Sequence, residues 1–555
     1  MIIGLFPFLG MTAEVPVGAT IEQIDPGRLP QREAAPPQPL SQQEAVYLPK
    51  KEDLPPIPQA EKVKFVLHRL IIEGNTVFTE SELRVLYQDK LGKEISLADL
   101  LKIPTLITKK YRDAGFVLTH AIIPPQTIDR SGTVRIQMIE GYIHAVHVKG
   151  KLTSGNQHLL EQYGERIARV RPTTMATLER YALLANDLPG LKVRFVLVPS
   201  VSEPGAADLT VLAREHHFGM EASTDNLATK IYGSEEYTLM GSVHGVTPGG
   251  SLSARTVQSY EASRLQFYEL AYQQQLNSDG LTWITRGNTA KTDPDLAVVG
   301  LEGLDSPGKS TDLSTMLRYP ILRSRRQNLF WDLEFEGLNS NTDFISDTLF
   351  EDRIRSVRTG VTYDFLDPLQ GMNVWYGQFS QGFDALGAEA SPPSRPGGEL
   401  AYSKVKGYLS RSQPLPQHFS WYIATEGQYG FDELLSAEEF GYGGSVFGYA
   451  YDPSEITGDR GISGKTELRY TLFPTHIPVQ YSQLFIYYDV GEVWNINSGT
   501  QPSVESAASA GGGIRAELKK HITLSFLIGK PLTHTVEQED NKDPRAFFTV
   551  SFRDD

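Results

Sequence analysis

From about residue 215 onwards, hydrophobic and polar residues alternate along short segments that are separated by turn residues. In one segment Trp331, Leu333 and Phe335 share a face, and the acidic residues between them share the other. This period of two predicts β-strands. The same alternation recurs at residues 419–424, 467–472, 514–519 and 548–552.

These alternating segments predict an all-β transmembrane barrel over residues 215–555. Roughly 340 residues, at about 21 per strand and connection, give about 16 antiparallel strands. A barrel of this width encloses a water-filled lumen, which would solvate the charged inner faces while the hydrophobic outer faces meet lipid. A soluble sandwich also alternates, but it does not call for aromatic residues at the strand ends.

Before residue 215 the pattern predicts two α+β units with the order β-α-α-β-β. In the first, residues 61–140, a strand over 64–73 precedes two helices that begin with capping boxes at Thr79–Glu82 and Ser96–Asp99. Two further strands follow, the first of them over 116–123. The same order repeats in residues 141–214. The second repeat contains the turn sequence NDLPG at Asn186, Asp187, Leu188, Pro189 and Gly190.

The first sixty residues predict little regular structure. Residues 1–13 are apolar and have the length of a signal-peptide remnant, although no basic residue precedes them. A short helix broken at Pro26 is expected near residues 20–32, and a mobile tail is the alternative. Residues 34–60 hold seven prolines and indicate a semi-rigid extended linker.

One long loop interrupts the alternating segments at residues 441–464. Its sequence, which begins GYGGSVFGYAYDPSEITGDRG, is too rich in Gly, Asp and Pro for a strand and too long for a hairpin turn. Long loops of this kind are usually functional. Acidic clusters at residues 438–439 and at Asp452, Glu455 and Asp459 predict solvated carboxylates, because their spacing fits no calcium loop.

Composition excludes several classes of protein. The 555 residues include no cysteine, so disulfides and thiolate metal sites are excluded. A net charge of −15 without a dense basic stripe argues against a nucleic-acid partner. The sequence has no nucleophile elbow, P-loop, dinucleotide fingerprint or His-Glu-x-x-His motif, which predicts a protein that is not an enzyme and uses no cofactor or metal.

The lid sequence SVFGYAYDPSEITGDRG and the segment FIYYDVG from Phe485 resemble the lid loop and the facing barrel wall of two-partner secretion outer-membrane transporters. This is the TpsB family of ShlB/FhaC/HecB-type haemolysin secretion proteins, within the BamA-like superfamily. NDLPG and the turn GNTVFT are similar to the polypeptide-transport-associated (POTRA) domains of that family. The resemblance implies a lid-loop tip and a barrel-wall lock, formed respectively by Phe447, Gly448, Tyr449, Ala450, Tyr451 and Asp452, and by Asp489 and Gly491.

In that family a loop-tip Arg pairs with the wall Asp. Here Tyr449 stands at the Arg position and Ala450 at the following Gly, whereas the Asp is present as Asp489. A carboxylate in a partly dry lumen needs donors, and either the Tyr449 hydroxyl or Arg460 is expected to supply them. The alternative is a solvated lumen carboxylate with no special partner.

The resemblance implies two POTRA domains, 61–140 and 141–214, in the periplasm, and a barrel in the outer membrane of a Gram-negative bacterium. It also implies that residues 14–33 form a plug helix. The expected function is recognition of a secreted exoprotein (TpsA-type) through its N-terminal domain, followed by unfolded translocation without nucleotide hydrolysis. The expected partners are this exoprotein and outer-membrane lipids, and the protein itself is expected to be a monomer. An assembly factor that inserts other barrels is the alternative, and a passive porin or adhesin is a weaker one.

Overall fold

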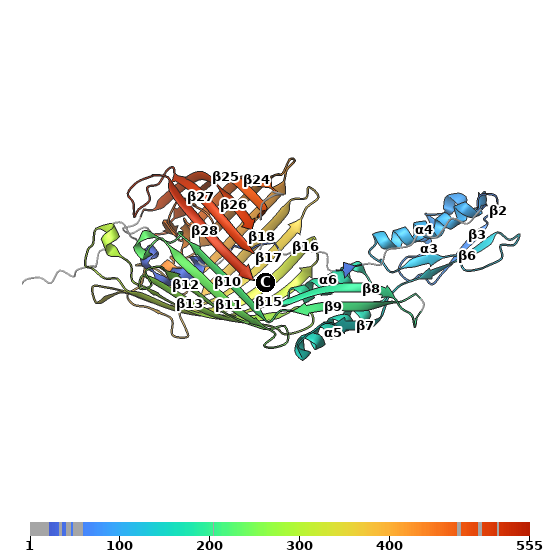
Figure 1. The fold of residues 1–555 in the computed structure, drawn as a ribbon, viewed down its shortest axis with the longest axis horizontal. Coiled ribbons are helices and arrows are strands. Elements are labelled where there is room, and N and C mark those ends of the chain that lie inside the picture. Colours follow the sequence, from blue (N-terminus) through green and yellow to red (C-terminus); the bar gives the residue numbers. More distant parts are fainter. Residues whose placement is uncertain are drawn as a thin grey trace, which may run out of the picture.

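The structure is a computed structural model that describes residues 21–32, 36–39, 46–47, 59–203, 205–473, 479–497, 502–518 and 521–554. The expected signal remnant, residues 1–13, and most of the proline-rich linker lie outside the described residues. Figure 1 shows a barrel at one end of the molecule, an α+β domain beside its rim, and a second α+β domain farther away. The C-terminus lies at the rim that faces these domains.

Sixteen antiparallel strands close into the barrel, as the alternation predicts. Closure comes from pairing of the first strand with the last, from Met220↔Asp554 to Asp225↔Thr549. A further short strand, β19 (Glu389–Ala390), pairs with β17. The wall strands are β10 (Phe218–Asp225), β11 (Glu236–His244), β12 (Ser251–Ser259), β13 (Leu265–Gln275), β14 (Thr282–Thr292), β15 (Gly308–Arg323), β16 (Gln327–Phe344), β17 (Asp347–Leu366), β18 (Met372–Gly382), β20 (Ser403–Pro414), β21 (Phe419–Gly430), β24 (Arg460–Leu472), β25 (Val479–Trp494), β26 (Val504–Leu518), β27 (Ile522–Pro531) and β28 (Arg545–Asp554).

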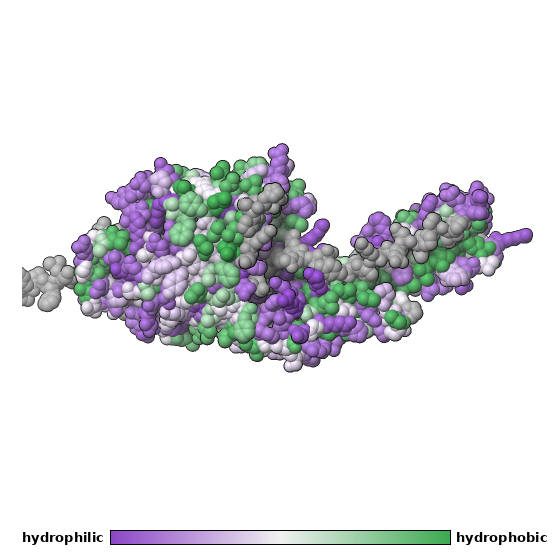
Figure 2. Space-filling model, viewed as in Figure 1, coloured by the Kyte–Doolittle hydropathy of each residue, from purple (hydrophilic) through white to green (hydrophobic). Residues whose placement is uncertain are grey.

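Side chains of opposite polarity face the two sides of the wall. In β16, Leu333 and Phe335 are exposed on the outer surface, whereas Asp332, which precedes them, is buried on the lumen side. Figure 2 shows hydrophobic residues gathered over the outer face of the strands, with hydrophilic residues at the far end of the barrel. None of the helices in the described part of the chain is long and apolar enough to cross a membrane.

The first α+β domain covers residues 59–140. Both predicted capping boxes are present, at the N-termini of α3 and α4. The predicted strand over 64–73 is divided in two, because Leu67 and His68 donate their backbone N–H groups to Lys93 and Gly132 and so change pairing partners. The strand predicted over 116–123 is also shorter. The elements are β2 (Lys64–Val66), β3 (Arg69–Glu73), α3 (Glu80–Arg84), η2 (Gln88–Lys90), β4 (Glu94–Ser96), α4 (Leu97–Asp113), β5 (His120–Ile122) and β6 (Thr133–Ile139).

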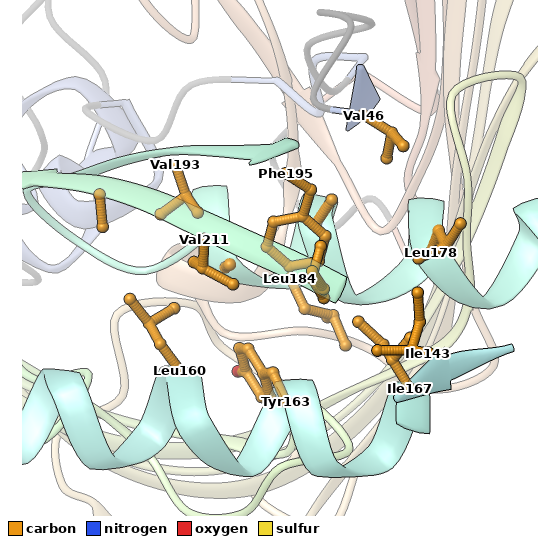
Figure 3. Close-up of a cluster of buried hydrophobic side chains, with 14 of the residues drawn as sticks. Val46, Ile143, Leu160, Tyr163, Ile167, Leu178, Leu184, Val193, Phe195 and Val211 are labelled. Carbon is orange, nitrogen blue, oxygen red and sulfur yellow. The ribbon is translucent and has the colours of Figure 1, made fainter. Parts of the chain in front are cut away.

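The second α+β domain, residues 143–215, adjoins the barrel rim and has the predicted β-α-α-β-β order. Its sheet has the strand order β1-β8-β9-β7, in which β1 (Val46–Tyr47) comes from the linker. The apolar faces of the helices pack against the sheet, and Figure 3 shows this core with Leu160, Tyr163, Leu184 and Phe195. The elements are β7 (Ile143–Lys149), α5 (Ser154–Ala168), α6 (Met175–Asn186), β8 (Leu191–Pro199) and β9 (Ala207–Glu215).

Two pieces of chain lie inside the barrel. The lumen segment, residues 21–32, comprises α1 (Ile21–Ile24), η1 (Pro26–Arg28) and α2 (Leu29–Arg32), and its Asp25 caps η1. The lid, residues 440–458, is a hairpin of β22 (Phe440–Tyr442) and β23 (Ile456–Gly458) rather than a strandless loop. The predicted range of 441–464 is too long, because wall strand β24 already begins at Arg460. Short 3-10 turns connect wall strands at η3 (Lys230–Tyr232) and η4 (Leu296–Val299), and η5 (Ser436–Glu438) lies between β21 and the lid.

Candidate functional site in the barrel lumen

The lid folds inward because its aromatic residues are buried against the inner wall. Phe447 and Tyr451, at the lid tip, join Tyr442 in a hydrophobic cluster with Val493 and Ala507 of β25 and β26. The Tyr451 hydroxyl donates to the carbonyl oxygen of Ala508 at 2.9 Å. The lid tip is therefore held by packing as well as by hydrogen bonds.

Asp489 of β25 is the polar anchor of the lid tip. Its Oδ2 accepts the backbone N–H groups of Gly448 and Tyr449, both at 3.0 Å. Its Oδ1 accepts hydroxyl hydrogen bonds from Tyr442 at 2.9 Å and Ser509 at 2.5 Å. The side chain is fully buried, so the alternative of a solvated carboxylate is wrong. Four donors at these distances compensate the lost water without a directly paired cation.

Gly491 provides the space for this contact. A Cβ atom added at Gly491 would lie 2.3 Å from the Tyr442 ring, a distance at which something must shift. The ring that donates to Asp489 therefore packs directly on the backbone two residues farther along β25. Both wall residues that the resemblance selects face the lid.

Tyr449 does not use its hydroxyl on Asp489, which corrects the first of the two expected donors. The hydroxyl donates to Oε1 of Glu467 at 3.1 Å and accepts from Nζ of Lys465 at 2.6 Å. Arg469 and Arg515 also form ion pairs with Glu467, at 2.7 and 3.1 Å. The positive charges of this cluster thus come from the barrel wall, and the lid contributes a neutral phenol.

The second expected donor, Arg460, is also wrong. Its Nε donates to the carbonyl oxygen of Gly430 at 3.0 Å, and its guanidinium lies 4.1 Å from the centroid of the Tyr429 ring. Arg460 therefore stabilises the junction of β21 and β24. It makes no contact with Asp489 among the interactions of the described residues.

The acidic clusters beside and within the lid are buried and paired, so the expectation of solvated carboxylates is wrong. Four of the five carboxylates pair with a cation from another strand or loop, whereas Glu455 accepts the backbone N–H of Glu537 at 2.7 Å. Asp452 pairs with Arg545 at 2.6 Å, and Glu438 pairs with both Arg358 and Lys404. These ion pairs tie the lid and η5 to the wall and to the loop that carries Arg395: Glu438 and Glu439 in or beside η5, Asp452 in the lid, and Asp459 after β23.

The lumen segment contacts both the wall and the lid. Asp25 accepts hydroxyl hydrogen bonds from Ser340 at 2.6 Å and from Ser436 at 2.8 Å. Arg28 donates to the lid residue Ser454 at 3.1 Å and to the carbonyl oxygen of Ser436. On the other side of the lumen, Arg32 pairs with Glu236 at 2.6 Å. Two separate pieces of chain therefore obstruct the lumen and touch each other.

A water-accessible cavity of about 1110 Å³ lies beside these obstructions. Its walls include Glu236, Arg286 and Arg318 of the barrel together with Asp187 and Pro189 of the second α+β domain. The cavity therefore lies where that domain adjoins the barrel.

The NDLPG turn joins the second α+β domain to the barrel. Asp187 forms a two-pronged ion pair with Arg323 at the end of β15, with both oxygens 2.7 Å from guanidinium nitrogens. Arg323 is almost fully buried and also donates to Asn328 at 2.8 Å. This ion pair fixes the domain at the rim.

The other residues of the turn shape the turn itself. Asn186 exchanges two hydrogen bonds with the backbone of Val193, which links the end of α6 to β8. Leu188 is buried in the domain core and Pro189 lines the cavity. Gly190 has a φ of 70°, and a Cβ there would lie 2.3 Å from the carbonyl oxygen of His216. The turn therefore requires a glycine at this position.

Family models match two parts of the chain. Residues 65–141 match the POTRA domain, ShlB-type, and residues 281–516 match the haemolysin secretion/activation protein ShlB/FhaC/HecB. The heme/hemopexin transporter protein HuxB of Haemophilus influenzae (strain 86-028NP) is 24% identical over 515 residues, which cover 88% of this chain and 87% of that relative. The chain belongs to the two-partner secretion transporter family.

Solved structures agree with this assignment at the level of the fold. CdiB from Escherichia coli has a TM-score of 0.70 at 16% identity, covering 91% of the transporter and 92% of that chain. CdiB from Acinetobacter baumannii has a TM-score of 0.60 at 15% identity, covering 89% and 90%. BamA from Haemophilus ducreyi lacking POTRA domains 1-3 has a TM-score of 0.52 at 14% identity, covering 88% and 100%. The transporter resides in the outer membrane of a Gram-negative bacterium, with its α+β domains in the periplasm.

Sequence reasoning missed the ion pairs that the cations of the transporter's lumen form. Glu467, Lys465 and Arg515 form the charge cluster around Tyr449, and Arg323 holds the NDLPG turn. The alternation marks positions such as Glu467 and Arg515 as lumen-facing, which is the one signal available. It does not indicate which of the many lumen charges meet.

Proposed function

We propose that the periplasmic domains of this transporter bind the N-terminal region of a secreted exoprotein, and that the exoprotein then passes unfolded through the barrel to the cell surface. The observation that supports this most directly is the double obstruction of the lumen by the lumen segment and the lid, which contact each other at Arg28 and Ser454. Both are attached to the barrel only by chain ends and reversible contacts. Passage of a polypeptide requires that they move.

The width of the lumen supports passage as an extended chain. The lumen of a 16-stranded barrel, with its polar lining in place, leaves room for an extended polypeptide. It is narrow for a folded domain of ordinary size. The lumen cavity is lined by charged and hydroxyl side chains together with apolar ones such as Met316 and Phe330, and the polar groups can hydrate a passing chain. These features support translocation in an unfolded state.

Transport would proceed without nucleotide hydrolysis. The sequence has no P-loop pattern, so forward motion must come from differences in binding free energy and from folding of the exoprotein outside. The hydrophobic outer band of the barrel contacts outer-membrane lipids, and the closed sheet leaves no wall strand unpaired, which suits a monomer.

Deletion of residues 61–214 tests the receptor role. The variant barrel should still insert, as shown by heat-modifiable migration in gels, but should secrete none of the exoprotein encoded beside the transporter. Secretion at the wild-type level from an inserted deletion variant would refute recognition through the periplasmic domains.

Insertion of other outer-membrane barrels is the second candidate function, because the fold also resembles BamA. Depletion of the protein from cells discriminates the two. Loss of an insertase lowers the levels of many outer-membrane proteins, whereas loss of a dedicated transporter should abolish secretion of one exoprotein and leave the others unchanged.

A further inference from the structure

We propose that the outer face of β14 and β15, at the cell-surface end of the barrel, binds a phosphate group of an outer-leaflet glycolipid between Lys291 and Lys309. The inference goes beyond the proposed function, because it requires only that the barrel lies in the outer membrane and makes no use of an exoprotein. It assigns a ligand of defined chemistry to one part of the wall.

Lys291 and Lys309 are cross-strand partners on the outside of the barrel. They lie directly opposite each other in the register of β14 and β15, and both are exposed. Their neighbours Ala290, Thr292 and Gly308 are buried on the lumen side, which places the two lysines on the outer face. Like charges at directly opposed positions repel each other. The wall therefore carries an unfavourable pair of charges that a bound anion would relieve.

The protein supplies no counter-ion to this pair. Neither lysine takes part in an ion pair or a hydrogen bond among the described residues. The neighbouring outward positions are neutral, with Thr289 opposite Thr311 and with Asn341 next to the pair on β16. Glu351, which lies opposite Asn341, pairs with Arg353 at 2.6 Å instead. A phosphate, which lysine ammonium groups bind well, would fill this gap.

The position of the pair along the strands identifies the anion as part of a lipid. Arg180 of the second α+β domain donates to the carbonyl oxygen of Pro320, so this end of β15 is periplasmic and the Lys309 end faces the cell surface. Between the two ends, the outward row of β15 includes Leu313, which is 64% exposed, and Leu317. The lysines thus lie just beyond the hydrophobic band, at the level of lipid phosphates, and acyl chains of the same lipid would cover Leu313.

Arg355 of β17 adds a third cation on this face. It follows the outward residue Val357 towards the cell surface, and it pairs with no carboxylate among the described residues. Its register partner Gly337 lies opposite Leu313, so two strand spacings and four residues separate Arg355 from Lys309, roughly 16 Å between the Cα atoms. This separation favours a disaccharide headgroup with a phosphate at each end over a lipid with a single phosphate.

The inner face of the same strands holds the lumen segment. The hydroxyl group of Ser310 donates to the carbonyl oxygen of Pro26 at 3.0 Å, and a Cβ atom at Gly308 would lie 3.1 Å from the Pro26 ring. Lys309 thus lies between two residues that touch the lumen segment from the other side of the wall. A phosphate that relieves the repulsion between β14 and β15 should therefore steady the surface on which this segment rests.

Binding of lipid A, a diphosphorylated acyl disaccharide, tests the site on the full-length transporter in phosphatidylcholine nanodiscs. The double variant Lys291→Gln and Lys309→Gln should bind fluorescent lipid A at least about tenfold more weakly than wild type, because two charge-assisted hydrogen bonds are lost. Wild type should bind the fully dephosphorylated lipid equally weakly. Lys530→Gln is the matched control and should keep the wild-type affinity, since Lys530 is exposed near the cell-surface end of β27 but lies opposite Ala510.

Lys309→Glu separates lipid binding from the stability of the wall. It converts the like-charged pair into an oppositely charged one, so the pairing of β14 and β15 should gain stability. The variant barrel should remain heat-modifiable in gels and yet lose lipid A binding as the double variant does. Wild-type affinity in Lys309→Glu, or an equal loss of affinity in Lys530→Gln, would overturn the site.

Inorganic phosphate distinguishes the source of the ligand. A millimolar excess should not displace lipid A, because the membrane holds the lipid at a high effective concentration beside the site. Full displacement would assign the site to a free anion and overturn its assignment to a glycolipid.

Planar bilayers test the link to the lumen segment. Lipid A in the cell-surface leaflet should lower the frequency of wild-type channel openings about two- to fivefold, the size of one cross-strand charge pair, and should not change the openings of the double glutamine variant. Equal opening frequencies of wild type with and without lipid A would overturn this link, while the binding measurements decide the site itself. No exoprotein enters these measurements, so failure of the site and failure of the proposed function are distinguishable.

Discussion

At the scale of single residues, Asp489 gathers four hydrogen bonds on one carboxylate. Its carboxylate accepts from two backbone N–H groups of the lid tip and from two hydroxyl groups. In Asp489→Asn the side chain becomes neutral, and an NH₂ donor replaces one of the two acceptor oxygens, so it faces either the two lid N–H groups or the two hydroxyl groups. We expect lid docking to weaken by about 1–2 kcal/mol, which raises the open population roughly 5–30-fold.

Single-channel recording in planar bilayers measures this change as more frequent or longer openings. Asp384→Asn is the matched control. It makes the same chemical change at a residue that is exposed in a loop and does not touch the lid. Identical gating of wild type and Asp489→Asn would show that the carboxylate charge does not hold the lid.

Glu140, in the first α+β domain, is likewise a carboxylate that accepts several hydrogen bonds. It accepts from the backbone N–H of Thr76 at 2.7 Å and from the Tyr111 hydroxyl at 2.9 Å. Burial alone would raise the pKa of Glu140, but these hydrogen bonds outweigh it, and the pKa lies below its ordinary value of 4.5. Unfolding therefore takes up a proton in acid, so the stabilisation is present above about pH 4.5 and is lost as the pH falls further.

We predict that Glu140→Gln lowers the stability of this domain by about 1–3 kcal/mol at pH 7. The difference from wild type should shrink below pH 4.5. Hydrogen exchange of the amides in β6 of the full-length protein measures both effects. Glu161→Gln, on the exposed face of α5, serves as the control. A destabilisation that does not vary with pH would contradict the role of the charge.

Residue identities such as Asp489 and Gly491 could be found from the sequence because a short motif marks them. Their partners could not. Tyr449 was expected to reach Asp489 through its hydroxyl, yet the backbone N–H of the same residue makes that bond and the ring turns toward Glu467. Main-chain donors have no sequence signature, since every residue except proline carries one.

At the scale of elements, the lumen segment and the lid depend on each other. Arg28 of η1 donates to Ser454 in the lid and to the carbonyl oxygen of Ser436 in η5, so one side chain bridges three elements. Arg28→Ala removes these bonds and leaves Ser436 without one of its donors. We expect both obstructions to loosen together, with a several-fold rise in the frequency of channel openings, since the lost bonds are worth about 1–3 kcal/mol.

Gln38→Ala is a suitable control for Arg28→Ala, because Gln38 also lines the cavity but is exposed. Cross-linking yield between the lumen segment and the lid provides a second readout. Increased openings with an unchanged position of the lumen segment would mean that the lid moves alone.

Elements with strong local signals were predicted best. The capping boxes placed the starts of α3 and α4, whereas the strand over 64–73 was divided by backbone bonds from Leu67 and His68 to distant residues. The lid shows the same limit: its glycines indicate a loop, but its short hairpin of β22 and β23 exists only because the barrel wall covers it. Tertiary contacts decide such short strands.

At the scale of the whole molecule, Asp187 and Arg323 set the position of the periplasmic domains relative to the pore. The alternation predicts the barrel and the helix signals predict the α+β domains, but no local pattern relates one to the other. The relation depends on an ion pair between residues 136 positions apart, in which Arg323 is buried and the Asp187 side chain is 32% exposed. The partly exposed pair of Glu179 and Arg325 supports it. The lumen cavity has walls from both the second α+β domain and the barrel, so it depends on this alignment.

Charge reversal tests the alignment. Asp187→Arg and Arg323→Asp should each abolish most secretion, because each leaves an uncompensated charge at a site where Arg323 is 2% exposed, at a cost of about 3–5 kcal/mol. The double variant restores opposite charges and should recover part of the activity. Arg325→Glu is the control, since a pair with one partner 40% exposed contributes at most about 1 kcal/mol. If the double variant secretes no better than the single ones while all insert normally, the ion pair does not position the domain, and the contacts of Arg166 and Arg180 with the strand ends must do so instead.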